Sequence, residues 1–229
     1  MAPRTSEHSD ARERRADRRR NRPRWNRQVF LNVPFDDIDR YEDCFLAYIA
    51  GLAGLALLPR SVLEIPSAGR DRLSRIFHLM RKCRYSVHDL SRIQLRAGRY
   101  PRFNMPLELG MATALTISRP AHDRYVFATD FRLVQQVASD LGGIDVYEHR
   151  GRPQGVLAAL TNAFVHHRHA VRLRELTIIR RELRRWADIN CRGTRPRRSV
   201  YEPAVFRDMV LFATGLAREV SGEPGPLSR

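Results

Sequence analysis

The sequence predicts an α/β protein with a doubly wound, parallel five-stranded sheet and a C-terminal helical appendage. Short apolar runs of β-prone residues alternate with helical patterns five times between residues 28 and 169, and this alternation is typical of a parallel sheet covered by helices on both faces. The 229 residues, of which 43% are hydrophobic, suffice for one substantial core. The last helical patterns have no strand between them, which predicts the appendage.

The strands are predicted where apolar runs end in turn-forming residues. They are expected at residues 28–33, in a run from 55 to 65 that is kinked at Pro59, and at 85–90, 124–129 and 144–147. Pro34 closes the first strand, because proline lacks the N–H group that a strand ladder needs.

Helices are predicted between the strands, where apolar residues recur every three or four positions. They are expected at about residues 39–52, 70–84, 105–117, 131–141 and 153–169. Gly51 and Gly54 are expected to end the first of these helices. Pro106 lies in the first turn of the helix at 105–117, a position that helix starts allow.

Both ends of the chain are expected to lie outside the α/β domain of residues 28–169. Residues 1–27 hold few apolar side chains and many arginines, so they predict a disordered basic arm. This arm makes weak, non-specific contact with nucleic acid, or it is a solvated tail. Residues 170–221 predict the helical appendage, and residues 222–229 predict a tail.

Arginine dominates the charge of the chain. The formal net charge is +16 and the isoelectric point is near 11.1, which favours anionic partners such as nucleic acid, nucleotides or a membrane surface. Lys82 is the only lysine. Such a bias toward arginine is also typical of a GC-rich genome, so the charge alone does not choose a partner.

The cysteines and the apolar runs indicate a cellular compartment. Cys44, Cys83 and Cys191 are few and far apart, which favours reduced thiols over a disulfide framework. No apolar run reaches the roughly 18 residues of a membrane span, and the first residues lack the apolar core of a signal peptide. We therefore expect a cytoplasmic protein without membrane contact.

The stretch from Asp89 to Gly110 is the most informative for function. Asp89 lies at the end of a predicted strand, and Glu108 lies in the first turns of the helix that follows the next loop. Open α/β sheets place carboxylates in this way at their ligand crevice. Asn104 is either the N-cap of that helix or part of the site.

Three segments resemble the TIR-like and nucleoside 2-deoxyribosyltransferase-like superfamily. They are VFLNVPFDD at residues 29–37, YSVHDLS at 85–91 and RFNMPLELGMA at 102–112. The resemblance covers about residues 29–164 and implies a flavodoxin-like sheet that holds a nucleotide or nucleoside. It also implies that Glu108, in the E-x-G-x-A segment, attacks or stabilises the anomeric carbon of the ribose. The loop between the last two segments is longer and more basic than the family pattern.

Glu108 is the predicted catalytic residue on chemical grounds as well. Cleavage of an N-glycosidic bond passes through a state resembling an oxocarbenium ion, which a nearby carboxylate can stabilise or trap. An acid in a first helical turn can also serve only to complement the helix dipole. Asp89 is the second predicted catalytic residue, and it would hold the ribose hydroxyl groups unless it only caps a turn.

The remaining site residues surround these two acids. The predicted substrate-binding residues are Asn32, Pro34, Phe35, Asp36, Arg70, Ser91, Asn104, Met105 and Gly110. Arg60, Arg70 and Arg102 are candidates for a diphosphate clamp, or they are solvated charges. No metal site is predicted, because the clustered His166, His167 and His169 lack an acid or a cysteine at ligand spacing. No cofactor is predicted either, and NAD or a nucleotide is expected as substrate or ligand.

Two classes of function follow from this interpretation. The first is an enzyme that breaks or transfers the N-glycosidic bond of NAD or a nucleoside. The second is a non-catalytic sensor that binds a nucleotide and signals or assembles through its C-terminal helices. The apolar stripe of the segment 171–189 is expected to be covered by the last helix, 203–220, either within one chain or from a second copy in a homo-oligomer.

Overall fold

The computed structural model describes residues 24–35, 41–65, 71–93, 103–137, 143–166 and 172–222. Its five strands are β1 (Gln28–Asn32), β2 (Leu58–Ser61), β3 (Tyr85–Asp89), β4 (Asp123–Ala128) and β5 (Val146–Glu148). All four pairings are parallel, in the order β2-β1-β3-β4-β5. The predicted flavodoxin-like α/β fold is therefore confirmed, and the chain reverses its winding direction between β1 and β3.

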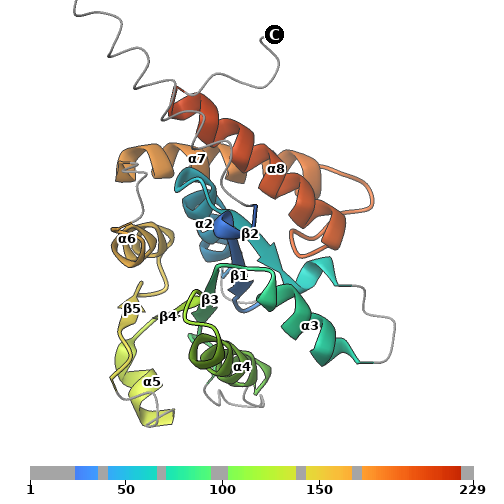
Figure 1. Ribbon diagram of the computed structural model, residues 1–229. Coiled ribbons are helices and arrows are strands. Elements are labelled where there is room, and N and C mark those ends of the chain that lie inside the picture. Colours follow the sequence, from blue (N-terminus) through green and yellow to red (C-terminus); the bar gives the residue numbers. More distant parts are fainter. Residues whose placement is uncertain are drawn as a thin grey trace, which may run out of the picture.

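The helices surround this sheet (Figure 1). They are α2 (Tyr41–Gly54), α3 (Arg72–Arg81), α4 (Asn104–Ser118), α5 (Phe131–Val137), α6 (Pro153–Ala163), α7 (Leu173–Ala187) and α8 (Pro203–Val220). Shorter turns are η1 (Arg24–Arg27), η2 (Val62–Glu64) and the π-helical η4 (Asp188–Arg192). Most of the predicted basic arm and tail, residues 1–23 and 223–229, lies outside the described residues.

The second strand differs from its prediction. Pro59 does not kink a long run; it lies inside the short strand β2 and pairs with Val29. The sheet order explains this, because β2 is an edge strand and proline is tolerated where one side of the ladder is unpaired. The apolar residues after β2 form η2, whose N-cap Ser61 and Glu64 make a capping box.

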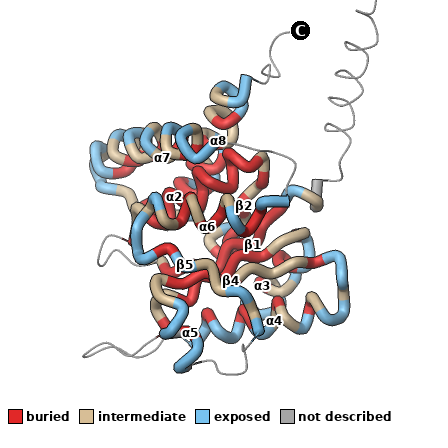
Figure 2. Tube along the Cα trace, turned by 90° about the vertical axis from the view of Figure 1, so that its left-hand side faces the viewer, coloured by how far each residue is buried: buried red, intermediate tan, exposed pale blue. Residues whose placement is uncertain are grey.

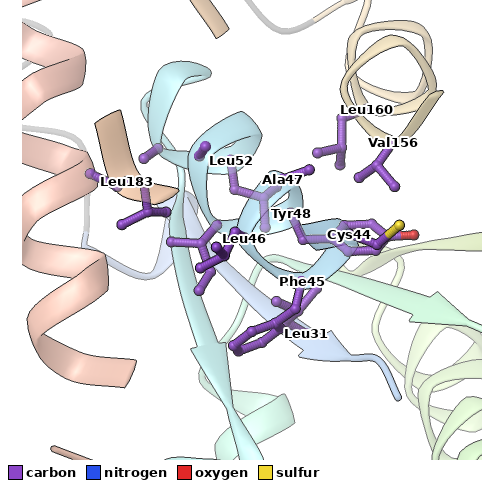
Figure 3. Close-up of a cluster of buried hydrophobic side chains, with 14 of the residues drawn as sticks. Leu31, Cys44, Phe45, Leu46, Ala47, Tyr48, Leu52, Val156, Leu160 and Leu183 are labelled. Carbon is purple, nitrogen blue, oxygen red and sulfur yellow. The ribbon is translucent and has the colours of Figure 1, made fainter. Parts of the chain in front are cut away.

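Helix α2 is the centre of the main hydrophobic core. Twelve of its fourteen residues are buried, which is the mark of a helix enclosed on all sides. Figure 3 shows its side chains between Leu31 of the sheet, Val156 and Leu160 of α6, and Leu183 of α7. The burial colours of Figure 2 follow the same pattern, with β1 and most of α2 in red.

The prediction that Gly51 and Gly54 break this helix was wrong for Gly51. Helix α2 runs through Gly51 and ends at Gly54, because both glycines give room to neighbouring helices. A Cβ atom at Gly51 would lie 2.5 Å from Leu160 of α6, and one at Gly54 would lie 2.2 Å from Leu176 of α7. Glycine costs helix stability, and here close packing of two further helices offsets that cost.

Gly54→Ala is therefore expected to lower the free energy of unfolding by about 1 kcal/mol. The gain of up to about 1 kcal/mol in helix propensity is outweighed by about 1–3 kcal/mol of overpacking. Gly215→Ala in α8 is the matched control, since nothing lies within 4 Å of a Cβ there, and it should be neutral or stabilising. Denaturant unfolding of both variants measures the difference, and equal effects would contradict the packing argument.

The C-terminal helices cover α2 within the same chain. Figure 1 shows α7 and α8 beyond α2, on the side away from α4. The apolar stripe of α7 is buried together with that of α8, through Leu176, Ile179, Leu183, Phe206 and Met209. Of the two alternatives for this stripe, the structure selects coverage in cis, so the stripe does not require a second copy.

A charge cluster fixes α7 to the start of α2. Nη1 of Arg184 lies 2.7 Å from Glu42 and 3.0 Å from Asp43, and its Nη2 lies 3.1 Å from Asp188. Arg192 also reaches Glu42, at 3.2 Å. The Arg184 side chain is only 20% exposed, so these bonds are shielded from solvent more than ordinary surface pairs.

Candidate functional site

The strand ends at the β1–β3 reversal carry polar side chains on both faces of the sheet. Asn32 ends β1 and reaches α4, where it bonds to Met105. Asp89 ends β3 and reaches α2, where it bonds to Tyr41 and Tyr48. Successive residues of a strand point to opposite faces, so His88 shares the face of Asn32. The crevice is thus bordered by two different polar groups.

Asp89 is the centre of a buried hydrogen-bond network. Its Oδ1 accepts from the N–H and hydroxyl groups of Ser91, and its Oδ2 accepts from the hydroxyl groups of Tyr41 and Tyr48. Nε2 of His149 lies 3.0 Å from Oδ2. Because Nδ1 of His149 accepts a bond from the Gly151 N–H group, the ring proton lies on Nε2 and faces Asp89.

The electrostatics of this network favour an ionised Asp89. Burial alone would raise the pKa of Asp89, but the neighbouring His149 and hydrogen bonds from His149, Ser91 and Tyr41 outweigh burial and lower it. Burial and the Asp89 charge raise the pKa of Tyr41 and of Tyr48, so both remain donors. The network is therefore an internal anion with several donors, which is how a buried charge can be tolerated.

This arrangement corrects the role predicted for Asp89. The side chain has no exposed surface, and both oxygens already face donors of the protein, so it is not open to a ribose. Ser91 is engaged as well, since its hydroxyl also accepts from the Thr129 N–H group at 2.8 Å. Through these bonds Asp89 and Ser91 connect the end of β3 to three other parts of the chain: α2, the end of β4 and the segment that follows β5. They therefore form the framework of the site.

Glu108 has a different environment. It lies in α4 and is 4% exposed, and its Oε2 has no hydrogen-bond partner among the described residues. Burial raises its pKa to about 7, and the charge of Arg72 at the start of α3 opposes this only in part. A carboxyl group of this kind changes its charge near neutral pH, and its Oε2 is a buried acceptor whose hydrogen-bonding capacity no described residue uses.

The position of Glu108 on α4 explains its burial. Ala112 and Leu115 follow it at spacings of four and seven, and both belong to the apolar cluster that joins α4 to α3 and to Phe30 of β1. Glu108 therefore lies on the apolar side of the helix and not on its outer side. It is also the only charged residue of α4.

The other predicted site residues fall into three groups. Pro34 is buried and Phe35 half-buried at the end of β1, where the Phe35 ring packs against Phe45 and Tyr201. Asn104 and Gly110 are exposed on α4. Asp36 and Arg70 lie outside the described residues, as does Arg102 of the predicted diphosphate clamp.

Three details of the prediction are wrong. Asn104 is not the N-cap of α4; the cap is Phe103, which makes no side-chain cap bond. Arg60 is not a free phosphate ligand, since its guanidinium group is bound to Glu64 at 2.8 Å and to Gln28. Helix α6 ends at Ala163, short of residue 169, and residues 167–171 lie outside the described part of the chain.

Four residues of the site were not predicted from the sequence. Tyr41 and Tyr48 are seven positions apart, which places them on one face of a helix, and this spacing was the only available signal for them. His88 lies in a buried strand, and His149 directly follows β5. Nothing in the spacing of the two histidines connects them to Asp89 or Asn32.

A cleft of about 320 Å³ lies elsewhere in the structure, at the amino ends of β1 and β2. Arg27, Gly54, Leu58 and Arg218 are among its lining residues, and none of the predicted site residues is.

In the described ranges, no group of three or more His, Cys, Asp or Glu residues could hold a metal ion. The helices described there also include none that is long and apolar enough to cross a membrane.

Near the β1–β3 reversal the fold thus buries two carboxyl groups, Glu108 with an oxygen that has no described partner and Asp89 with both oxygens bonded. Comparisons of the chain with protein-family models, curated proteins and solved structures find no match.

Proposed function

We propose that the protein cleaves or transfers the N-glycosidic bond of NAD or of a related nucleotide or nucleoside, with Glu108 as the reacting carboxylate. The observation that carries this proposal is the buried Oε2 of Glu108, which has no partner among the described residues, together with a pKa raised to about 7. The resemblance of residues 108–112 to the E-x-G-x-A segment of the TIR-like superfamily supports the same assignment.

The chemistry follows from the environment of Glu108. Its ionised form is poorly solvated in the folded protein, because the side chain is buried on the same side of α4 as Ala112 and Leu115 of the apolar cluster. When the bond between ribose and base breaks, the sugar becomes positively charged. A desolvated carboxylate then stabilises that charge more than a hydrated one would, either through space or by forming a covalent ribosyl ester. Water or a second acceptor would complete hydrolysis or transfer.

The pH dependence of turnover separates this role from that of a proton donor. If Glu108 acts as a carboxylate, kcat/KM should rise with pH and level off above about 7, where its pKa lies. The measurement is the release of free base from NAD and a panel of nucleosides between pH 5 and 9. A rate that instead falls as pH rises through 7 would contradict the carboxylate role.

The engagement of Asp89 favours a second candidate, a nucleotide sensor without turnover. Asp89 is saturated by donors of the protein, so of the two candidate acids only Glu108 has an oxygen without a partner among the described residues. Calorimetric titration with NAD distinguishes the two functions. Binding without release of base would support the sensor, and release of base would support the enzyme.

A further inference from the structure

Helix α4 begins without a cap of its own. Its N-cap residue, Phe103, makes no side-chain bond to the first turn, although such bonds normally satisfy the free N–H groups of a helix start. A tertiary contact to a carbonyl group attaches the first turn to the sheet. Nδ2 of Asn32, at the end of β1, donates to the carbonyl oxygen of Met105 at 3.2 Å.

The same amide group also bonds to His88. Nδ2 of Asn32 lies 3.1 Å from Nδ1 of His88. A carbonyl oxygen such as that of Met105 can only accept, so the atom facing it must be the amide nitrogen, whose two protons serve the two bonds. Nδ1 of His88 therefore accepts, and the proton of this imidazole lies on Nε2.

His88 supplies this acceptor without adding a charge. Its side chain has no exposed surface, and burial lowers its pKa to about 3, with His122 and Arg124 acting in the same direction. A protonated histidine would lose the acceptor and would bring a positive charge to the face of the sheet that α4 covers. Both bonds are therefore kept throughout the neutral pH range.

We infer that Asn32 and His88 form a clamp that holds the first turn of α4, and with it the carboxyl group of Glu108, against the ends of β1 and β3. Met105 and Glu108 are three positions apart, so they lie on neighbouring parts of one helix face. Fixing the Met105 carbonyl thus fixes the turn that carries Glu108. Asn32 is then a positioning residue, although the sequence predicts a substrate contact, and His88 is a new member of the site.

The test is the pKa of Glu108, measured by carbon-13 NMR titration of protein labelled at the glutamate carboxyl carbons. The Glu108 signal is assigned by its loss in Glu108→Gln. Asn32→Leu removes both bonds, and His88→Leu removes the acceptor that orients the Asn32 amide. In both variants water should reach the carboxylate, and its pKa should fall from about 7 by at least about one unit toward the ordinary value. An unchanged pKa in both variants would overturn the clamp.

A conservative variant separates the acceptor from the ring. His88→Asn places an amide oxygen where Nδ1 lies, so it should keep the bond to Asn32 and the pKa near 7. A fall as large as in His88→Leu would overturn the role of the acceptor. If the leucine variants do not fold, Asn32→Ser is the milder substitution: its hydroxyl group ends short of the position of Nδ2, so both bonds are lost while the side chain stays polar. The same fall is expected, and an unchanged pKa would again overturn the clamp.

A general loss of stability must not be mistaken for this effect. Gly54→Ala is the control, because Gly54 packs against Leu176 of α7 in the main core, and its Glu108 pKa should remain near 7. The importance of the clamp rests on the proposed function of Glu108. The NMR titration, however, needs no substrate. An inactive protein would contradict the proposed function and leave the clamp standing.

Discussion

Glu108→Gln is expected to make the protein more stable above pH 7, by up to about 3 kcal/mol. The pKa of Glu108 rises from 4.5 to about 7 on folding, and each unit of difference corresponds to about 1.4 kcal/mol between the two protonation states. Gln has nearly the same shape and carries no charge, so the variant avoids the cost of burying an ionised carboxylate.

The sign of this effect depends on pH. Below pH 4.5 the carboxyl group is protonated in both the folded and the unfolded chain, and wild type and variant should be similar. Between 4.5 and about 7, the unfolded chain releases the proton and the folded protein keeps it, so the wild type loses stability as pH rises. Above about 7 the difference is constant.

Denaturant unfolding of both proteins at pH 4, 6 and 8 measures this difference. It should grow from near zero to its full value across the series. A variant that is less stable than wild type at pH 8 would show that Glu108 makes favourable contacts in its ionised form. A buried residue that lowers the free energy of unfolding without a structural benefit is typical of a functional site.

Asp89→Asn is expected to have the opposite effect, a loss of about 3–5 kcal/mol in the free energy of unfolding. Both carboxylate oxygens accept bonds, from Ser91 on one side and from Tyr48 and His149 on the other. An amide must turn its NH₂ group toward one of these sets, which leaves buried donors facing a donor.

The pH dependence identifies the cause of this loss. The pKa of Asp89 is lowered on folding, so its contribution is present above the unfolded value of about 3.9 and disappears as pH falls through the lower folded value. The variant should lack this part of the acid transition. Asp208→Asn is the control, since Asp208 is 45% exposed and its loss should cost less than about 0.5 kcal/mol. Equal costs for the two substitutions would contradict the network account.

The sheet was predictable because each buried strand is a short apolar run bounded by turn residues. Pro59 was misplaced because periodicity does not reveal which strand lies at an edge. Gly51 was misjudged for a related reason: propensity disfavours glycine in a helix, and only the packing of α6 against α2 explains its place there.

The site was predictable only in part. The sequence singles out Glu108 as a candidate, and its spacing to Ala112 and Leu115 is a signal of its burial. The role of Asp89 was not predictable, because its partners Tyr41, Tyr48 and His149 are 48, 41 and 60 positions away in the chain. Local patterns do not show contacts of this range.

Turnover by Glu108→Gln is the most direct test of the claim that Glu108 is the reacting carboxylate. Wild type and variant are incubated at pH 8 with NAD and the nucleoside panel, and free base is measured by chromatography, with folding checked in the same samples. We expect release of base by the wild type and a loss of about a hundredfold or more in the variant, because several kcal/mol of transition-state stabilisation are removed. Equal rates of base release from two folded proteins would contradict the assignment.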